Sequence, residues 1–396
     1  MNKKLLNTGV QEFIFKNINA DIVSVLLKKQ LFQDISNQEV VEQLEARKKC
    51  EKKLPTWFRT PGIYYPNKLN IEQTSSEVTA RYKAEIVSGK VLLDATGGFG
   101  VDSYFFSKKI AQVIHCEIDE NLSKITAHNF HILGTSYIKI VSNNGLNFLK
   151  NSGSGFDWIY LDPSRRNDGK GKVFRLSDCL PNILSHSDLL FAKSEKILLK
   201  TSPLLDFSIG IKELRHVKAI HVISIKNEVK ELLWVLEKEY FGEIRINTIN
   251  FTKSGNQTFD FFLNEEKNFV TTYSDYSEPL SYLYEPNAAI LKSGAFKTLG
   301  NRLHLKKLHE HSHLYTSKKL IDFPGRRFKI QEVVPFKKKL IAQIGIRKAN
   351  ITIRNFPISV SDLRKKLKIK DGGATFLLFT TDLKMNRIVI VASKIP

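Results

Sequence analysis

Three glycines and an aspartate form the first group of residues whose types and spacing suggest chemistry. Asp94 ends an apolar run, and Gly97, Gly98 and Gly100 follow it within six residues. Glycine has no Cβ, so a glycine-rich turn lets a ligand approach the backbone closely. If a helix begins after Gly100, its unpaired N–H groups point toward that ligand as well. The turn is therefore predicted to bind a small molecule.

A second acid, Glu117, lies 23 residues after Asp94, at the end of the next apolar run. A carboxylate at the end of the second strand can accept hydrogen bonds from both hydroxyls of a ribose. The glycine turn alone is weak evidence. Together with a strand before it, a helix after it and an acid one strand later, it favours a cofactor that contains a nucleoside.

The residues around the turn discriminate between two such cofactors. Ser103 stands where the dinucleotide fingerprint has its third glycine, so a nicotinamide dinucleotide fits poorly. An acid before the glycines, Asp94, is better explained by a ligand with a cationic amino group. The methionyl end of S-adenosylmethionine carries such a group, and this is the cofactor that the sequence favours.

Asp162 and Pro163 follow the fourth apolar run, and Ser164, Arg165 and Arg166 come directly after them. Ligands of open α/β sheets bind at the carboxyl ends of the strands, so Asp162 and Pro163 are predicted to lie where a ligand binds. Asp162 and a backbone carbonyl can accept the hydrogens of an exocyclic base nitrogen and orient its lone pair toward a methyl donor. Arg165 and Arg166 can bind a phosphate or stack on a base.

These residues need a scaffold in which strands and helices alternate. Six β-branched runs are each typical of one buried strand, at 91–98, 113–119, 138–142, 158–163, 196–203 and 219–225. Helical stretches separate them, which predicts an α/β fold with a doubly wound, Rossmann-like and mainly parallel sheet. We expect a helix at 229–240, followed by an antiparallel strand pair at 243–253 and 258–264.

Helices are expected before this sheet, because two capping boxes mark helix starts there. Ser36 is followed by Glu39, and Thr74 by Glu77, each at the spacing of a capping box. At the other end of the chain, the run 351–356, the helical stretch 360–369 and a terminal strand pair predict a second, smaller α/β module.

Positive charge is concentrated in that C-terminal part. The chain carries 61 Lys+Arg and 40 Asp+Glu, a net charge of +21. Residues 286–396 contain 24 Lys+Arg and 6 Asp+Glu, a net charge of +18. The first 285 residues contain 37 Lys+Arg and 34 Asp+Glu, a net charge of only +3. A field so localised attracts polyanions, so the C-terminal part is predicted to contact nucleic acid.

The segments 94–102, 115–119 and 162–166 have the order and spacing found in class I S-adenosylmethionine-dependent methyltransferases, and the sequence resembles that family. The segments 71–84 and 351–373 are similar to a bacterial group of these enzymes. In that group a methyltransferase domain precedes a ferredoxin-like segment and a THUMP-like domain. THUMP domains bind RNA, so the resemblance implies an RNA-binding C-terminus.

The resemblance implies a role for each candidate residue. Cofactor contacts are implied for Asp94, Gly97, Gly98, Gly100, Glu117 and Asn144. Asn143 or Asn144 stands where the family often has an aspartate against the adenine amino group. Catalytic roles are implied for Asp162 and Pro163, and substrate contacts for Ser164, Arg165 and Arg166. Nitrogen-methylating relatives have an aromatic residue where Ser164 and Arg165 stand.

The expected domains are an N-terminal helical region at 1–56, a class I methyltransferase domain at 57–275, a ferredoxin-like segment at 276–320 and a THUMP-like domain at 321–396. The expected function is methylation of a nucleotide base in tRNA or rRNA by S-adenosylmethionine. The alternatives are a non-enzymatic RNA-binding protein with a retained nucleotide fold, a nicotinamide-dependent oxidoreductase, and a methyltransferase acting on protein or a small molecule.

Several other classes of protein are disfavoured. The three cysteines have no paired spacing, and the histidines between 304 and 313 lack a matching acid or cysteine pair, so no metal site is predicted. No apolar run approaches the ~18 residues that span a bilayer. The first 22 residues lack the apolar segment of a signal peptide. We therefore expect a cytoplasmic protein in a reducing compartment, without a membrane partner.

Overall fold

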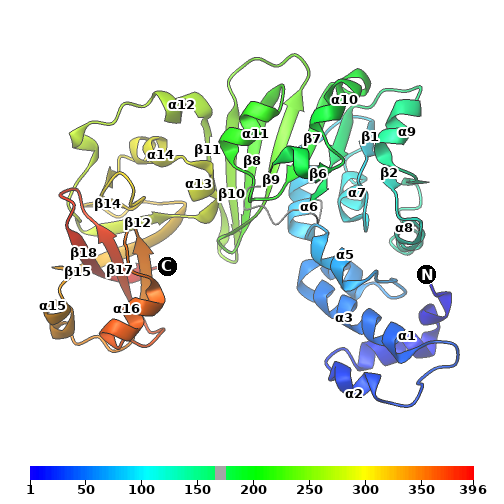
Figure 1. Ribbon diagram of the computed structural model, residues 1–396, viewed down its shortest axis with the longest axis horizontal. Coiled ribbons are helices and arrows are strands. Elements are labelled where there is room, and N and C mark those ends of the chain that lie inside the picture. The colour runs from blue at the N-terminus through cyan, green and yellow to red at the C-terminus, as the bar shows by residue number, and fades with distance from the viewer. Residues whose placement is uncertain (166–174) are drawn as a thin grey trace. The chain divides into compact units, whose positions relative to one another are not determined.

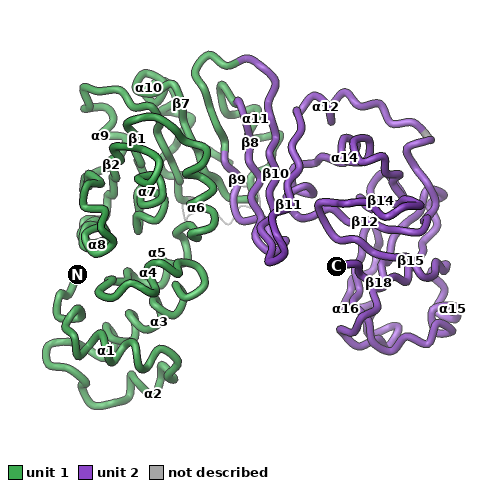
Figure 2. Tube along the Cα trace, turned by 180° about the vertical axis from the view of Figure 1, so that it is seen from behind, with its two compact units in different colours: residues 1–217, 234–240 green, residues 218–233, 241–396 purple. Residues whose placement is uncertain are grey.

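The computed structural model describes residues 1–165 and 175–396, so the candidate Arg166 lies outside the described residues. The chain forms two units, which Figure 2 shows in different colours. The first unit comprises residues 1–217 and 234–240, and the second comprises residues 218–233 and 241–396.

The N-terminal part of the first unit is helical, as predicted. Its elements are a 3-10 helix at Lys3–Leu6 and helices α1 (Thr8–Lys16), α2 (Ile22–Leu26), α3 (Asn37–Lys53), α4 (Pro55–Arg59) and α5 (Lys68–Gln73). The capping box predicted at the start of α3 is present. Ser36 Oγ accepts from the Glu39 N–H (3.2 Å), and the Glu39 carboxylate accepts from the Ser36 N–H (2.9 Å).

A parallel sheet with the predicted alternation of helices forms the rest of this unit (Figure 1). Its strands are β1 (Val91–Asp94), β2 (Gln112–Glu117), β3 (Lys139–Ser142), β4 (Trp158–Leu161) and β7 (Lys196–Thr201), and its helices are α6 (Glu77–Ala84), α7 (Val101–Phe106), α8 (Glu120–Ile132), α9 (Gly145–Asn151), α10 (Ser187–Lys193) and α11 (Phe207–Glu213). The strand order is β7-β4-β1-β2-β3, and all four pairings are parallel. The order reverses between β1 and β4, and ligands of doubly wound sheets bind at such a reversal.

The second capping box is wrong, because Glu77 has a tertiary partner. α6 begins at Glu77 itself, and Ser76 is its N-cap, since Ser76 Oγ accepts from the Thr79 N–H (3.3 Å). The buried Glu77 carboxylate instead accepts from the N–H and the hydroxyl of Thr56, at 2.5 and 2.9 Å. A side chain that bonds a distant segment is not available to cap its own helix.

The predicted helix at 229–240 is also wrong, because this segment forms strand β9 (Glu228–Glu237). Residues Leu232 to Leu236 are all buried, which suits a strand with both faces covered. The turn before it decides the outcome. β8 (Val217–Ile225) is joined to β9 by Lys226 and Asn227, whose φ values of 52° and 65° fit a two-residue hairpin turn.

The antiparallel pair predicted next is present as β10 (Arg245–Thr252) and β11 (Gly255–Phe262). These two strands belong to the second unit, where the strand order is β11-β10-β8. β9 is divided, since its residues 228–233 belong to the second unit and its residues 234–237 to the first.

The C-terminal part of the second unit is built on one seven-stranded sheet. Its helices are α12 (Leu263–Asn268), α13 (Ala288–Ser293), α14 (Phe296–Arg302), α15 (Lys338–Gln343) and α16 (Val360–Leu367). Its strands, in spatial order, are β13 (Lys306–Lys307), β14 (Tyr315–Ser317), β12 (Tyr282–Pro286), β15 (Gly325–Pro335), β18 (Arg387–Ile395), β17 (Thr375–Thr381) and β16 (Asn350–Arg354). The predicted terminal pair is β17 and β18, which are antiparallel.

This sheet joins the segments on either side of residue 320. One core cluster contains Leu283 of β12 together with Phe328 of β15 and Ile390 of β18. The buried Glu285 carboxylate of β12 forms ion pairs with Arg326 and Arg354, which lie beyond residue 320. Residues 276–320 therefore share a core and a buried ion-pair network with residues 321–396.

No helix in the described ranges is long and apolar enough to cross a bilayer. Across the same ranges, no group of three or more His, Cys, Asp or Glu side chains is arranged to hold a metal ion.

Candidate functional site

The loops after β1 and β2 are joined at the carboxyl edge of the parallel sheet. The Gly97 N–H donates to the Cys116 carbonyl (2.7 Å), and the Gly98 N–H donates to Glu117 Oε2 (2.8 Å). The other carboxylate oxygen of Glu117 accepts from the Asp119 N–H (2.7 Å). Glu117 is therefore held beside the glycine loop, as the sequence predicts for an acid that binds ribose hydroxyls.

The loop after β1 is joined to the end of β4 in the same way. The Ala95 N–H donates to the Tyr160 carbonyl (3.0 Å), and the Asp162 N–H donates to Thr96 Oγ1 (2.7 Å). Asp162 thus lies next to the glycine loop. The structure brings the glycines, Glu117 and Asp162 to one edge of the sheet.

The glycines of the loop have different environments. A Cβ on Gly97 would lie 2.1 Å from Cε1 of the buried His115, so the backbone passes directly over that ring. Gly98 has a φ of +58°, and a Cβ there would meet no atom within 4 Å. Gly100 has a φ of +80°, and its Cβ would clash with Phe130 at 2.6 Å. Side chains therefore pack against the loop at Gly97 and Gly100, whereas no atom lies close to the Cβ position of Gly98.

This difference predicts unequal losses of stability for two matched substitutions. Gly97→Ala should lower the free energy of unfolding by about 1–3 kcal/mol, because the methyl group overlaps His115. It should also weaken the binding of S-adenosylmethionine by displacing the loop. Gly98→Ala should cost only about 1 kcal/mol, the strain of a left-handed backbone. Urea unfolding and calorimetry measure both effects, and equal losses for the two variants would contradict the packing argument.

Asp94, His115 and Ser103 form a buried group beneath the loop. Ser103 Oγ donates to Asp94 Oδ2 (2.6 Å) and lies 3.0 Å from His115 Nδ1, and the Thr96 N–H donates to Asp94 Oδ1 (3.2 Å). The Asp94 side chain is fully buried. Burial raises the pKa of Asp94 to about 7 and lowers the pKa of His115 to about 4. Asp94 therefore acts on the loop by holding Thr96 and Ser103.

These shifts predict how Asp94→Asn changes the pH dependence of stability. The pKa of Asp94 is raised from 3.8 to about 7 on folding, so the folded state holds this proton more tightly and loses stability as the pH rises from about 4 to 7. Relative to the original protein, the variant should gain up to about 1.4 kcal/mol per pH unit in this window. The difference should be constant above about pH 7.5. Denaturant unfolding at several pH values measures it, and a difference that does not change with pH would contradict the shift.

Asn143 and Asn144 lie at the same edge, where α9 begins. Asn144 Oδ1 accepts from the N–H groups of Leu146 (2.9 Å) and Asn147 (3.2 Å), so this side chain caps α9. Asn143 Oδ1 accepts from the Asn144 N–H (2.7 Å). A Cβ on Gly145 would lie 2.2 Å from the Ala95 carbonyl oxygen, so the start of α9 packs against the loop after β1.

One of the residues expected at the methyl acceptor, Asp162, belongs to an ion pair. Asp162 is 31% exposed, and its Oδ2 lies 2.5 Å from Nζ of Lys200 on the neighbouring strand β7. Pro163 is buried. Ser164 is exposed, and it forms with Arg165 the short strand β5 (Ser164–Arg165), which pairs with β6 (Cys179–Leu180).

Reasoning from the sequence missed three polar side chains of this site. They are His115 under the glycines, Thr96 between β1 and β4, and Lys200 beside Asp162. A signal for Lys200 was present, because a lysine within the apolar strand 196–201 needs a carboxylate partner when it is buried.

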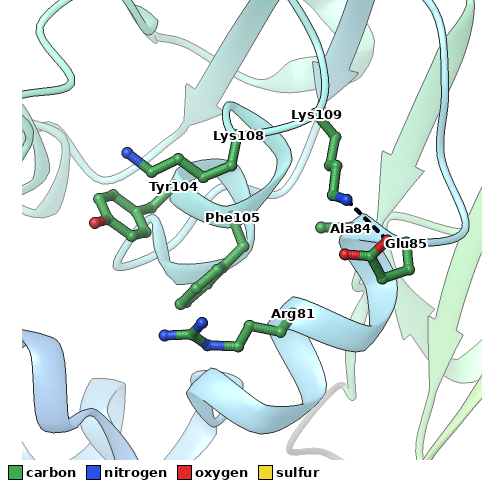
Figure 3. A pocket seen from close by; sticks show the side chains of 7 residues that line it. All are labelled: Arg81, Ala84, Glu85, Tyr104, Phe105, Lys108 and Lys109. Atoms are coloured by element: carbon green, nitrogen blue, oxygen red, sulfur yellow. Dashed lines mark hydrogen bonds and ion pairs between the residues drawn. The ribbon is translucent and has the colours of Figure 1, made fainter.

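A cavity of about 330 Å³ lies elsewhere, between α6 and the end of α7 (Figure 3). Arg81 lies over the Phe105 ring at 4.9 Å from its centroid, and Lys108 Nζ is 4.4 Å from the Tyr104 centroid. α7 begins at the glycine loop, and the cavity adjoins its other end. Its lining residues include none of the site residues predicted from the sequence.

The edge suits the nucleoside part of the cofactor predicted from the sequence. The Asp94 carboxylate, expected to meet the cationic amino group of the methionyl part, is instead fully buried and accepts hydrogen bonds from Thr96 and Ser103. A Cβ at Gly98 would meet no atom within 4 Å, so a ligand could approach the backbone there, and the Glu117 oxygens could accept hydrogen bonds from ribose hydroxyls. The residues present therefore fit S-adenosylmethionine through its nucleoside part.

Comparisons with known proteins match the two C-terminal domains and the chain as a whole. Residues 282–324 match a family model described as a ferredoxin-like domain, and residues 325–394 match one described as THUMP domain-like. A crystal structure from Porphyromonas gingivalis W83, of a protein named provisionally as a methyltransferase, is 30% identical in sequence. It covers 100% of this chain and 99% of its own, with a TM-score of 0.89.

Two strains of Mycobacterium tuberculosis supply further relatives. In each, a protein described as an uncharacterised S-adenosylmethionine-dependent methyltransferase is 23% identical over 322 residues, which is 78% of this chain and 82% of the relative.

Proposed function

Because the chain belongs to the S-adenosylmethionine-dependent methyltransferases with C-terminal ferredoxin-like and THUMP-like domains, we propose that it methylates a nucleotide of RNA, in tRNA or rRNA. The observation that carries this proposal is that one chain contains both a sheet edge suited to the cofactor and a strongly cationic region with a THUMP-like domain. A methyltransferase for a small molecule or a protein would leave the charge of +18 in residues 286–396 unexplained.

Phosphate contact is supported by lysines that make up an exposed cationic surface. We define this lysine surface by residues of α15, of α16 and of the chain beside them, Lys337, Lys338, Lys339, Lys365 and Lys368. Lysine ammonium groups bind the RNA backbone independently of sequence, so such a surface positions the RNA and leaves the choice of nucleotide to the methyltransferase edge.

Each residue at the cofactor edge has a proposed role. Gly97, Gly98 and Gly100 let the methionyl part approach the backbone, and Asp94 shapes their loop. Glu117 accepts hydrogen bonds from the ribose hydroxyls. The side-chain carbonyl of Asn144 is used in capping α9, so its NH₂ group is left to donate to a ring nitrogen of adenine.

Asp162 and the backbone of Pro163 orient the methyl acceptor, and Ser164 and Arg165 contact the RNA around it. A bound S-adenosylmethionine supplies an electrophilic methyl group, so the protein has mainly to align the acceptor with it.

The experiment that tests the proposal is mass spectrometry of nucleosides from tRNA and rRNA of a strain that lacks the gene. One methylated nucleoside should be missing and should return when the gene is restored. An unchanged nucleoside profile, together with no transfer of label from S-adenosylmethionine to that RNA by the purified protein, would contradict an RNA substrate.

A further inference from the structure

The carboxylate at the acceptor position is paired with a lysine that the strand register places beside it. β4 and β7 are parallel, with Tyr160 opposite Leu198 and Leu161 opposite Leu199. The next position in this register is occupied by Asp162, directly after β4, and by Lys200 on β7. Lys200 Nζ lies 2.5 Å from Asp162 Oδ2, and the lysine side chain is only 12% exposed. The ion pair is therefore built into the sheet and is not a chance surface contact.

A second lysine lies in the same buried charge network. Lys83 of α6 is fully buried and lies 2.8 Å from Asp102 Oδ1. Asp102 also accepts from the hydroxyl of Tyr160, two residues before Asp162 (2.8 Å). Burial by itself would raise the pKa of Asp102, but the positive charges of Lys83 and Lys200 hold that pKa below its ordinary value. Two positively charged lysines therefore act on the carboxylates near the carboxyl end of β4, and one of them, Lys200, forms an ion pair with Asp162.

These ammonium groups discriminate between two kinds of methyl acceptor. An exocyclic amine becomes positively charged when it takes a methyl group, and a neighbouring ammonium group opposes that charge. Lysine has no acceptor atom, so Lys200 cannot receive the hydrogens of such an amine. A hydroxyl has the opposite need, because its oxygen becomes more nucleophilic as it gives up its proton. A carboxylate can take that proton, and an ammonium group stabilises the negative charge that develops on oxygen.

Among the described residues, the loops that directly follow β4 and β7 provide no aromatic stacking partner for an extruded base. The described segments after β4 and β7, residues 162–165 and 202–206, contain no aromatic side chain. Enzymes that extrude a base usually hold it between aromatic or apolar side chains. A ribose hydroxyl needs no such support, and the 2′-hydroxyl is the group that distinguishes RNA from DNA.

We propose that the methyl acceptor is the ribose 2′-hydroxyl of an RNA nucleotide, activated by the Asp162–Lys200 pair. This inference rests on the proposed function of the protein in RNA methylation and replaces the base acceptor expected from the sequence. The hydroxyl oxygen forms a bond to the methyl carbon while the carbon–sulfur bond breaks, and that electron pair stays on sulfur. The hydroxyl proton passes to Asp162, and Lys200 stabilises the oxygen as the proton leaves.

The test uses the full-length protein, S-adenosylmethionine with a labelled methyl group, and total tRNA and rRNA from a strain that lacks the gene. The RNA is digested to nucleosides, and mass spectrometry of the fragments locates the label on the ribose or on the base. Label on the ribose supports the proposal. Label on a base, on either a ring nitrogen or an exocyclic nitrogen, overturns it while leaving the proposed RNA function intact. No label in RNA contradicts the proposed function itself.

Variants of Lys200 give an independent readout. Lys200→Met should lower kcat by about a hundredfold, while KM for RNA and the affinity for S-adenosylmethionine change less than about threefold. Lys200→Arg, which keeps the positive charge, should recover part of the rate. The matched control is Lys196→Met at the other end of β7, where Lys196 Nζ lies 5.8 Å from the Trp158 ring centroid. An unchanged kcat for Lys200→Met, or an equal loss for Lys196→Met, would overturn the role of Lys200.

Discussion

Asp162→Asn should reduce methyl transfer by about a thousandfold, while the affinity for S-adenosylmethionine stays within about threefold of the original value. The amide cannot take a proton from the acceptor, and it removes the charge that Lys200 neutralises. The hydrogen bond that places Asp162 beside the glycine loop uses its backbone N–H, so it survives the substitution. The loss should therefore appear in kcat, and calorimetry with S-adenosylmethionine checks that the cofactor site is intact.

A matched control lies at the other end of the same strand. The carboxylate of Asp157, just before β4, accepts from the N–H groups of Lys90 (2.6 Å) and Val91 (2.8 Å). Asp157→Asn removes one negative charge from the same strand but leaves the acceptor edge unchanged, so its kcat should be near that of the original protein. Transfer by Asp162→Asn at more than a tenth of the original rate would remove this carboxylate from the chemistry.

Replacing the five residues of the lysine surface by glutamine should weaken RNA binding on the order of a hundredfold at 0.1 M salt. Each phosphate contact that is lost should also reduce the slope of log affinity against log salt by about 0.7–0.9. Substitution is preferable to truncation, because β15 and β18 complete the sheet that contains β12. Filter binding at several salt concentrations measures both quantities.

The control replaces five exposed lysines of the N-terminal region by glutamine, namely Lys3, Lys28, Lys29, Lys48 and Lys52. It changes the net charge of the protein by the same amount. If both sets weaken binding equally, the effect comes from overall charge, and the C-terminal surface has no special role. Tight binding of RNA by the first variant, with an unchanged salt slope, would also contradict the proposal.

Local sequence signals predicted those elements whose stability depends on their own residues. The six apolar runs became strands because they are short, rich in β-branched residues and bounded by turn residues, which favours strands over helices. The capping box at Ser36 and Glu39 formed because both partners lie within one turn. Glu77 has the same spacing from Thr74, but Thr56 binds its carboxylate. A pattern within one segment does not reveal a partner that lies 21 residues away.

The segment 229–240 shows a second limit of local patterns. Its leucines and glutamates favour a helix, whereas the hairpin turn at Lys226 and Asn227 directs the chain back beside β8. All of Leu232 to Leu236 are buried, and a strand allows this because its two faces can both be covered. Long-range burial therefore outweighed the helix propensity of this segment.

The chemistry of this protein was readable from the sequence in part, since order along a parallel sheet sets position in space. The carboxyl ends of neighbouring parallel strands meet at one edge, so residues at the ends of β1, β2 and β4 could be expected to lie together, and the structure brings the glycines, Glu117 and Asp162 to that edge. Only the tertiary structure decided how that site is charged. It placed Lys200 beside Asp162 through the register of β4 and β7, and it buried Asp94 and His115 beneath the loop. Register and burial depend on contacts between distant segments, and no spacing along the chain encodes them.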